Sequence, residues 1–440
     1  MADTNRRLAN RILIGLVIGV VAGLLTLALG RMFPGLLDIM RRISTHVLDP
    51  FGQVFLRILF FVVIPLVFAS LATGVLQLGR LDRLGPLAGR TFALFFLNMG
   101  IGVALGLLMM NILQPGQHLA PEAKLRLMEE FGSTAQSYVA AQATQPAMSL
   151  SLIVDMFMPK NLFGAFVGNN RNTLGDVLPL ILFALLVGAV GTQLVEEKRR
   201  RLQDGLELVT DVMTRIVHFA LLLAPYAVPA MIYSVIVKVG IDILIALGVF
   251  VIGCTAVLLL HLFGTMSVFL KLWTTRSPRA FFRDTKTVLV TAFSTSSSNA
   301  TLPAALECAR NTLKVSPPVA GFVLPLGATM NMSGTALYEG CVVLFVAQVF
   351  GVDLGPGQQI TLLLLSVLSA VAVAGIPGGS LPLIAGLLVS FGIPPEGIGI
   401  VIGADRILDM TRTMTNVGCD LVTAVVVEAQ SPIPKSDVSA

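Results

Sequence analysis

Five polar side chains recur along one face of the last apolar segment of the chain. Arg412 has a planar guanidinium that binds two carboxylate oxygens at once, and Asp409, one helical turn away, suits an ammonium group. Together they fit an amino acid whose side chain is also acidic. At about 100° of rotation per residue, the five form a stripe about 80° wide. The five residues are Asp405, Asp409, Arg412, Asn416 and Asp420, and successive members are four, three, four and four positions apart.

The same residues allow other interpretations. Asn416 and Asp420 lie further along the stripe and suit a small, hard cation with oxygen ligands. Alternatively, the stripe is a set of salt bridges that joins helices, with Asp409 paired to Arg412 three residues on. Glu339, just after a break in an earlier apolar segment, is expected to carry a proton. Alternatively, Glu339 is a polar residue at the membrane–water interface on the outer side.

The composition predicts a multi-span membrane protein. Of the 440 residues, 55% are hydrophobic and only 12% charged, and the mean hydropathy is +0.85. Soluble domains have about 25% charged residues, so a soluble enzyme or a nucleic-acid binder is excluded. The net charge of +5 does not indicate nucleic acid, because the basic residues form short clusters between apolar blocks. An ionised side chain at mid-bilayer costs at least ~2.5 kcal/mol, so the polar stripe should face protein or a cavity.

Six uncharged runs in the first 270 residues are long enough to cross a bilayer. Basic clusters precede the first run and follow the second, fourth and sixth, so the N-terminus is expected to be cytoplasmic. Arg31, Arg41 and Arg42 are an exception on the outer side, where the chain approaches a long, tilted second span. Residues 114–176 are expected to form an outer loop. The runs are residues 12–30, 58–79, 91–121, 177–195, 216–237 and 243–270.

The C-terminal third has a different pattern. An apolar segment broken by small polar residues, followed by a span with polar residues inside it, occurs twice, at about 287–347 and 357–427. Broken backbone at membrane depth is tolerated only inside protein or beside a cavity. Paired broken segments in two halves indicate a transporter binding site. The first hairpin should enter from inside and the second from outside, which makes the units an inverted pair.

Other chemistry is not indicated. The four cysteines show no metal spacing and are expected to be buried core residues. The four histidines are scattered singly, as packed or interfacial residues, and Ser297 and Ser298 have no nearby base. No catalytic cluster is apparent, so an intramembrane enzyme is disfavoured. The cysteines and histidines are Cys254, Cys308, Cys341, Cys419, His46, His118, His218 and His261.

Four ordered motifs give the chain a strong resemblance to the dicarboxylate/amino acid:cation symporters, the glutamate transporter family. The resemblance implies an all-α integral membrane protein with eight transmembrane helices and two re-entrant helical hairpins arranged as inverted repeats. It also implies a homotrimer in which a transport domain slides, elevator-like, against a scaffold. The motifs are Ser296-Ser297-Ser298 with Thr301-Leu302-Pro303, residues 331–338, the tip 375–379, and Asp405 to Asp409 running into Arg412, Thr413 and Asn416.

The resemblance also implies roles for single residues. Arg412 would bind the side-chain carboxylate of the substrate and Asp409 its amino group. Other substrate contacts would come from Ser296, Ser298, Thr335, Ile376, Ser380, Thr413 and Asn416. One sodium site would comprise Asp420 with carbonyls of Gly327, Asn331 and Asn416. A second would comprise carbonyls near Thr329, Met332, Ala370, Val371 and Val373. Glu339 stands where proton-coupled relatives place a proton-carrying glutamate.

Two departures from the family pattern concern a third sodium site. Ser333 occupies a position that is acidic in sodium-driven members, and Asn98-Met99 replaces a Thr-Ser pair. Both changes remove hard oxygen ligands. We therefore expect fewer coupled sodium ions, with proton coupling contributing or dominant.

The resulting prediction is a secondary active symporter for glutamate or aspartate in the bacterial inner membrane, with both termini cytoplasmic and no cofactor besides Na⁺ and/or H⁺. The alternatives are a C4-dicarboxylate:cation symporter and an ion channel. Five regions are expected: scaffold 1–78; span three of the transport domain and the start of the outer loop, 79–148; scaffold 149–240; transport-domain core 241–430; and a cytoplasmic tail, 431–440.

Overall fold

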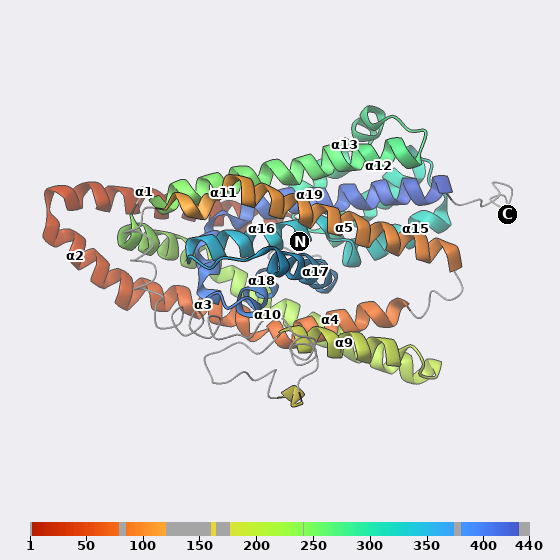
Figure 1. Cartoon of the computed structure of the whole chain (residues 1–440), viewed down its shortest axis with the longest axis horizontal. Coiled ribbons are helices and arrows are strands. Elements are labelled where there is room, and N and C mark those ends of the chain that lie inside the picture. The colour runs from red at the N-terminus through yellow and green to blue at the C-terminus, as the bar shows by residue number, and fades with distance from the viewer. Residues whose placement is uncertain are drawn as a thin grey trace.

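The regular elements are helices. The computed structural model describes residues 2–78, 85–119, 160–163, 177–240, 242–373 and 380–430, and no strand occurs in these ranges. The prediction of an all-α protein is confirmed (Figure 1). The α-helices are α1 (Ala2–Met32), α2 (Pro34–Ile43), α3 (Asp49–Phe61), α4 (Val63–Leu78), α5 (Gly85–Leu113), α9 (Val177–Gly191), α10 (Glu196–Val239), α11 (Asp242–Leu259), α12 (Met266–Trp273), α13 (Pro278–Thr295), α14 (Ser298–Glu307), α15 (Pro317–Met330), α16 (Ser333–Val349), α17 (Pro356–Ala372), α18 (Leu381–Ser390) and α19 (Ile398–Gln430).

Several of these helices are long and apolar enough to cross a bilayer. In the described ranges four stretches qualify directly: Ile14–Met32, Leu87–Gln117, Ile243–Trp273 and Pro317–Val349. A fifth candidate is α10, which bends by 51° between Val217 and Leu222. Pro225 lies just beyond the bend, and its ring removes a backbone hydrogen bond to the preceding turn. Helix α19, which contains six charged residues, is not among these stretches.

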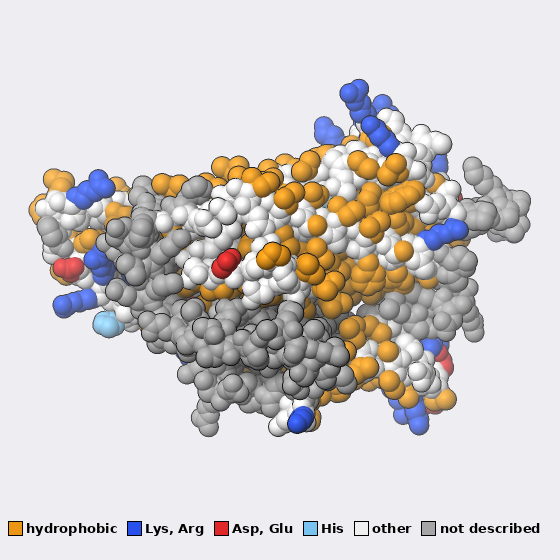
Figure 2. Space-filling model, viewed as in Figure 1, with side chains coloured by type: hydrophobic (Ala, Val, Ile, Leu, Met, Phe, Trp, Pro, Cys, Tyr) orange, Lys and Arg blue, Asp and Glu red, His pale blue; other side chains and the backbone are white. Residues whose placement is uncertain are grey.

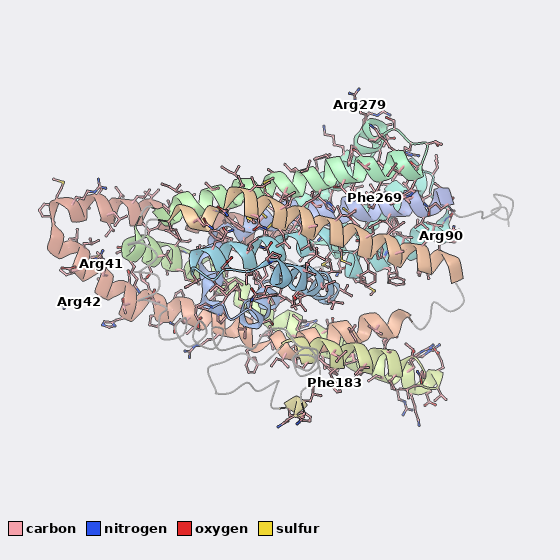
Figure 3. All side chains as sticks on the ribbon, viewed as in Figure 1. Arg41, Arg42, Arg90, Phe183, Phe269 and Arg279 are labelled. Carbon is pink, nitrogen blue, oxygen red and sulfur yellow. The ribbon has the colours of Figure 1, made fainter. Side chains whose placement is uncertain are left out.

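The surface agrees with membrane insertion. Lys and Arg side chains gather at the two ends of the long axis, and an apolar surface lies between them (Figure 2). Arg41 and Arg42 lie at one end, whereas Arg90 and Arg279, from two clusters predicted to be cytoplasmic, lie at the other (Figure 3). Along α1, Ile14, Val17, Ile18, Val21 and Leu25 are each at least half exposed. Such a face is suited to lipid rather than to water.

The first set of helices packs around α10. Helix α1 lies along it, and α3 and α4 contact it, while α9 packs on α4. Gly15, Gly19 and Gly23 form a stripe that allows the close approach of α1. A Cβ at Gly19 would lie 2.7 Å from the carbonyl oxygen of Pro229, and one at Gly15 would lie 2.8 Å from that of Pro225. Small residues at this spacing bring membrane helices into backbone contact.

The second set packs around α19. Helices α5, α11, α12, α13, α14, α15 and α16 all contact it, and α16 also lies along α5. Sixteen of the seventeen α16 residues are buried. Gly106 of α5 permits this packing, because a Cβ there would lie 3.0 Å from the carbonyl oxygen of Leu337. The candidate site therefore lies within this second set.

Candidate functional site

The polar stripe of α19 faces protein, as predicted. The five side chains are 2–6% exposed, so the helix presents no charge to lipid. Asp405, Asp409 and Arg412 lie against Tyr338 of α16 and Ser380, which precedes α18. Asn416 and Asp420 lie further along, against the break between α15 and α16.

Arg412 is the centre of a buried charge cluster. Its Nη2 donates to Asp409 Oδ1 at 2.6 Å, and its Nη1 donates to Ser380 Oγ at 2.8 Å. Nη1 also lies 3.4 Å from Asp405 Oδ1. The guanidinium carbon is 4.3 Å from the centroid of the Tyr338 ring, and the Tyr338 hydroxyl donates to Asp405 Oδ1 at 2.8 Å. The pairing of Asp409 with Arg412, which belongs to the alternative interpretation of the stripe as a set of salt bridges, is thus present in the structure.

Arg406 completes the cluster from the edge of the stripe. Its Nη1 lies 3.5 Å from Asp409 Oδ2, and its side chain is buried. Two guanidinium groups therefore face two carboxylates. Charges this well enclosed need such partners, because an unpaired ion inside protein costs several kcal/mol. The positive and negative charges of the cluster balance. The oxygen atoms that Arg412 contacts could nevertheless be replaced by those of another carboxylate.

The chain breaks where α19 presents Asn416. Helix α15 ends at Met330, Asn331 and Met332 are not helical, and α16 begins at Ser333. Asn416 Oδ1 accepts from the backbone N–H groups of Gly334 and Thr335 at 2.8 and 3.3 Å, and its Nδ2 donates to Thr335 Oγ1 at 3.1 Å. These N–H groups have no partner within α16, because they belong to its first turn. A side-chain oxygen or a substrate carboxylate can satisfy them.

Asp420 lies beside the end of α15. Its Oδ1 accepts from Asn331 Nδ2 at 2.8 Å, and a Cβ at Gly327 would overlap with the carboxylate. The last carbonyls of a helix are unsatisfied and carry partial negative charge. Asp420 and the C-terminus of α15 therefore form an oxygen-rich region suited to a hard cation. The residues of the first predicted cation set therefore lie together, and their role stays a prediction.

The second predicted cation set lies at the ends of two broken helices. Thr329 and Met332 flank the end of α15, whereas Ala370, Val371 and Val373 lie at the end of α17, which contacts α15. Two C-termini with free carbonyls can provide several oxygen ligands without any charged side chain. No group of three or more His, Cys, Asp and Glu side chains that could hold a metal occurs in the described residues.

The serine-rich tip is a turn between two helices. Helix α13 ends at Thr295, Ser296 adopts a left-handed conformation with φ 51° and ψ 33°, and α14 begins at Ser298. Ser297 Oγ caps α14 by accepting from the N–H of Ala300 at 3.2 Å. Ser296 and Ser298 are buried, and Ser296 Oγ has no hydrogen-bond partner among the described residues.

The remaining predicted substrate contacts are Thr413, Ser380 and Ile376. Thr413 Oγ1 donates to the carbonyl oxygen of Asp409 at 2.8 Å, so its hydroxyl is engaged within α19. Ser380 contacts Arg412, as described above. Ile376 and the rest of the second tip, residues 375–379, lie outside the described residues.

Glu339 lies on α16 and is completely enclosed by the surrounding protein. Its exposure is 0%, and neither carboxyl oxygen has a hydrogen-bond partner in the described part of the chain. The Ser369 hydroxyl of α17 lies near without hydrogen-bond geometry. This position disfavours the alternative in which Glu339 lies at a water interface. All four cysteines are buried free thiols, as predicted.

Sequence reasoning missed three contributions. Tyr338 lies in the motif at residues 331–338, but its stacking on Arg412 was not predicted. Asn98 was treated only as a lost ligand, whereas its amide bonds to both His261 and Asn331. His261 was expected to be an ordinary packed residue. The polar character of Asn98 and His261 within long apolar runs was the only signal available for them.

Comparisons with known proteins identify the family. The model of the sodium:dicarboxylate symporter family matches residues 8–430. The proton/sodium-glutamate symport protein of Geobacillus stearothermophilus is 32% identical over 419 residues, covering 95% of this chain and 93% of the relative. The proton/glutamate-aspartate symporter of Escherichia coli is 27% identical, covering 87% and 85%. The C4-dicarboxylate transport protein of Bacillus subtilis is 26% identical, covering 97% and 94%. The chain therefore belongs to the sodium:dicarboxylate symporter family.

Proposed function

We propose that this protein is a secondary active symporter that takes up glutamate or aspartate together with H⁺ and/or Na⁺. The observation that carries the proposal is the buried guanidinium of Arg412, placed between Asp409 and the Ser380 hydroxyl. A guanidinium and a carboxylate at adjacent positions complement a substrate with an acidic side chain and an ammonium group. The names of the relatives described above agree with this substrate class.

Substrate binding is an exchange of partners. The side-chain carboxylate of the substrate takes the N–H donors that Arg412 now gives to Asp409, and Asp409 turns to the substrate ammonium group. Each charge keeps an opposite partner, so the exchange avoids an unpaired buried ion. Asn416, Thr335 and Ser298 bind the α-carboxylate of the substrate beside the first N–H groups of α16, which now donate to Asn416. Ser296, Ile376, Ser380 and Thr413 complete the enclosure.

Two coupling-cation sites are proposed. Asp420 with carbonyls of Gly327, Asn331 and Asn416 forms the first, and the gathered oxygens beside the end of α15 support it. The carbonyls near the ends of α15 and α17 form the second, at Thr329, Met332, Ala370, Val371 and Val373. Ser333 and Asn98-Met99 provide fewer oxygen ligands for a third and no carboxylate, and the Asn98 oxygen is engaged with His261, which supports fewer coupled sodium ions.

Glu339 is proposed as the proton carrier. A carboxyl group enclosed on all sides, with no described hydrogen-bond partner, has little to stabilise a negative charge. Glu339 lies on α16 within electrostatic range of Arg412. Loading and release of a proton there would therefore accompany substrate binding.

The transport movement is proposed to be of the elevator type, in a homotrimer of the inner membrane with both termini cytoplasmic. The division of helices supports it: α1 to α4, α9 and α10 pack as one set, and α5 with α11 to α19 as another. The first would be the scaffold and the second the mobile domain, with the turn at Ser296 and the predicted tip at 375–379 closing two re-entrant hairpins. Eight transmembrane spans are part of the same proposal.

The main test is uptake of labelled aspartate into proteoliposomes with sodium and proton gradients imposed separately. We expect saturable, concentrative uptake driven by at least one gradient. Competition by succinate stronger than by glutamate would favour the C4-dicarboxylate alternative, which the Bacillus subtilis relative supports. Uptake that neither saturates nor exceeds the outside concentration would indicate a channel and overturn the proposal.

A further inference from the structure

A row of buried side-chain hydrogen bonds joins four elements of the second helix set. His261 Nε2 lies 2.8 Å from Asn98 Oδ1 on α5, Asn98 Nδ2 lies 3.2 Å from Asn331 Oδ1, and Asn331 Nδ2 lies 2.8 Å from Asp420 Oδ1. The four side chains are 0–3% exposed. The proposed mechanism uses only the last two, so the first two have no assigned purpose.

The chemistry of the groups fixes the direction of this chain. When it holds a cation, Asp420 is an ionised carboxylate that can only accept, so the Asn331 amide turns its NH₂ toward Asp420 and its oxygen toward Asn98. Asn98 must then donate to Asn331 and present its own oxygen to His261. His261 is therefore the donor, as the neutral tautomer with hydrogen on Nε2. Its other nitrogen, Nδ1, is buried without a hydrogen-bond partner among the described residues.

The local backbone places the His261 ring in this position. His261 lies in a short π-helical segment, Leu260–Thr265, between α11 and α12. Such segments shift a side chain relative to a regular helix and occur frequently at functional sites. On α5, Gly102 lies one turn after Asn98, and a Cβ there would lie 3.2 Å from His261 Nε2. A larger residue at 102 would press on the ring.

We propose that His261 is a positioning residue for the coupling-cation site. Acting through Asn98 and Asn331, it occupies Asp420 Oδ1 with a protein donor and leaves Oδ2 to face the cation. It also fixes the orientation of Asn331, whose carbonyl belongs to the same site. The inference rests on the proposed function, because it takes Asp420 as a cation ligand. It adds His261, Asn98 and Asn331 as the residues that determine how strongly Asp420 binds the cation.

The test compares three variants in proteoliposomes, with aspartate uptake measured against sodium concentration. His261→Leu keeps the volume but removes the donor and leaves the Asn98 oxygen buried without a partner, which corresponds to about a tenfold effect. We expect the sodium concentration for half-maximal uptake to rise about tenfold, with little change in maximal rate. His261→Gln retains an N–H at a similar reach and should stay within about threefold of the parent. Leu262→Met, a neighbouring packing change, is the matched control.

A fourth variant and a second measurement guard against misfolding. Asn98→Ala breaks the chain from α5 and should raise the half-maximal concentration by a similar factor. Purified protein should also lose part of its sodium-dependent thermal stabilisation in both His261→Leu and Asn98→Ala, a readout that needs no transport.

The outcomes separate the inference from the proposed function. An unchanged half-maximal concentration in His261→Leu, or a fall in maximal rate alone that glutamine does not rescue, would overturn the positioning role. Parent protein that concentrates aspartate with a proton gradient but is indifferent to sodium would also overturn it, while leaving the symporter proposal intact. Parent protein without any uptake would instead count against the proposed function.

Discussion

Removing both members of the central ion pair distinguishes a binding site from a salt bridge that only joins residues of α19. Arg412→Gln alone leaves Asp409 and Asp405 with one guanidinium fewer in a buried cluster. Loss of one partner of a buried pair costs about 3–5 kcal/mol of stability. Asp409→Asn with Arg412→Gln removes one charge of each sign, so the net charge of the cluster stays zero, while Asp405 loses Arg412 and Arg406 loses Asp409 as ion-pair partners. The double variant should therefore recover part of the stability lost in the single variant, through its restored charge balance.

Uptake should follow the opposite pattern. Arg412 now makes two short hydrogen bonds, at 2.6 and 2.8 Å, with donors that the substrate carboxylate would use. Charge-assisted bonds contribute roughly 1.5–3 kcal/mol each, so losing two corresponds to roughly 3–6 kcal/mol. That is a rise in KM of about 10²–10⁴-fold, which restored folding does not correct. The double variant should be more stable than Arg412→Gln yet almost inactive toward aspartate.

The assay combines thermal unfolding in detergent with labelled aspartate uptake for the parent, both single variants and the double variant. Lysine at 412 is a useful addition, because it keeps the charge but loses the two-pronged geometry. Near-normal aspartate uptake by the double variant would refute the reasoning and establish the pair as a structural link.

Three further predictions concern other parts of the molecule. Glu339→Gln should abolish stimulation of aspartate uptake by an inward proton gradient while leaving sodium stimulation, measured with each gradient imposed alone; retained proton stimulation would exclude Glu339 as the carrier. Gly19→Ala should destabilise the protein by about 1–3 kcal/mol through the clash with Pro229, whereas Gly100→Ala, where the added Cβ meets open space, should be neutral or better in thermal unfolding. Asp420→Asn should raise the sodium concentration for half-maximal uptake at least tenfold, and an unchanged value would remove Asp420 from the cation site.

Much of this site was predictable from sequence because the bilayer restricts what polar residues can do. The stripe on α19 was visible from spacing alone, and its burial followed from the cost of exposing charge to lipid. The breaks at Ser296 and Asn331 were visible as small polar blocks inside apolar runs, and the structure has non-helical residues at both. These are local signals with one energetic explanation.

The contacts between distant segments were not predictable in the same way. Nothing in the sequence pairs Tyr338 with Asp405 or orders the hydrogen bonds that begin at His261, because these depend on helix rotation and packing. Gly15, Gly19 and Gly23 were an available signal for close packing of the first span, and sequence analysis did not use it. Their partner, α10, is about two hundred residues away, so only the structure identifies it.

The charge balance of α19 gives a physical reason for coupling. Asp405 and Asp409 face Arg406 and Arg412, so the cluster is neutral before substrate arrives. Asp420 has no ion-pair partner in the described part of the chain, and glutamate or aspartate brings one further net negative charge. Moving both through a low-dielectric interior is costly unless positive charge accompanies them. Sodium ions or protons that accompany the substrate restore neutrality, so the residues of one helix and the charge of the substrate give a physical reason for co-transport.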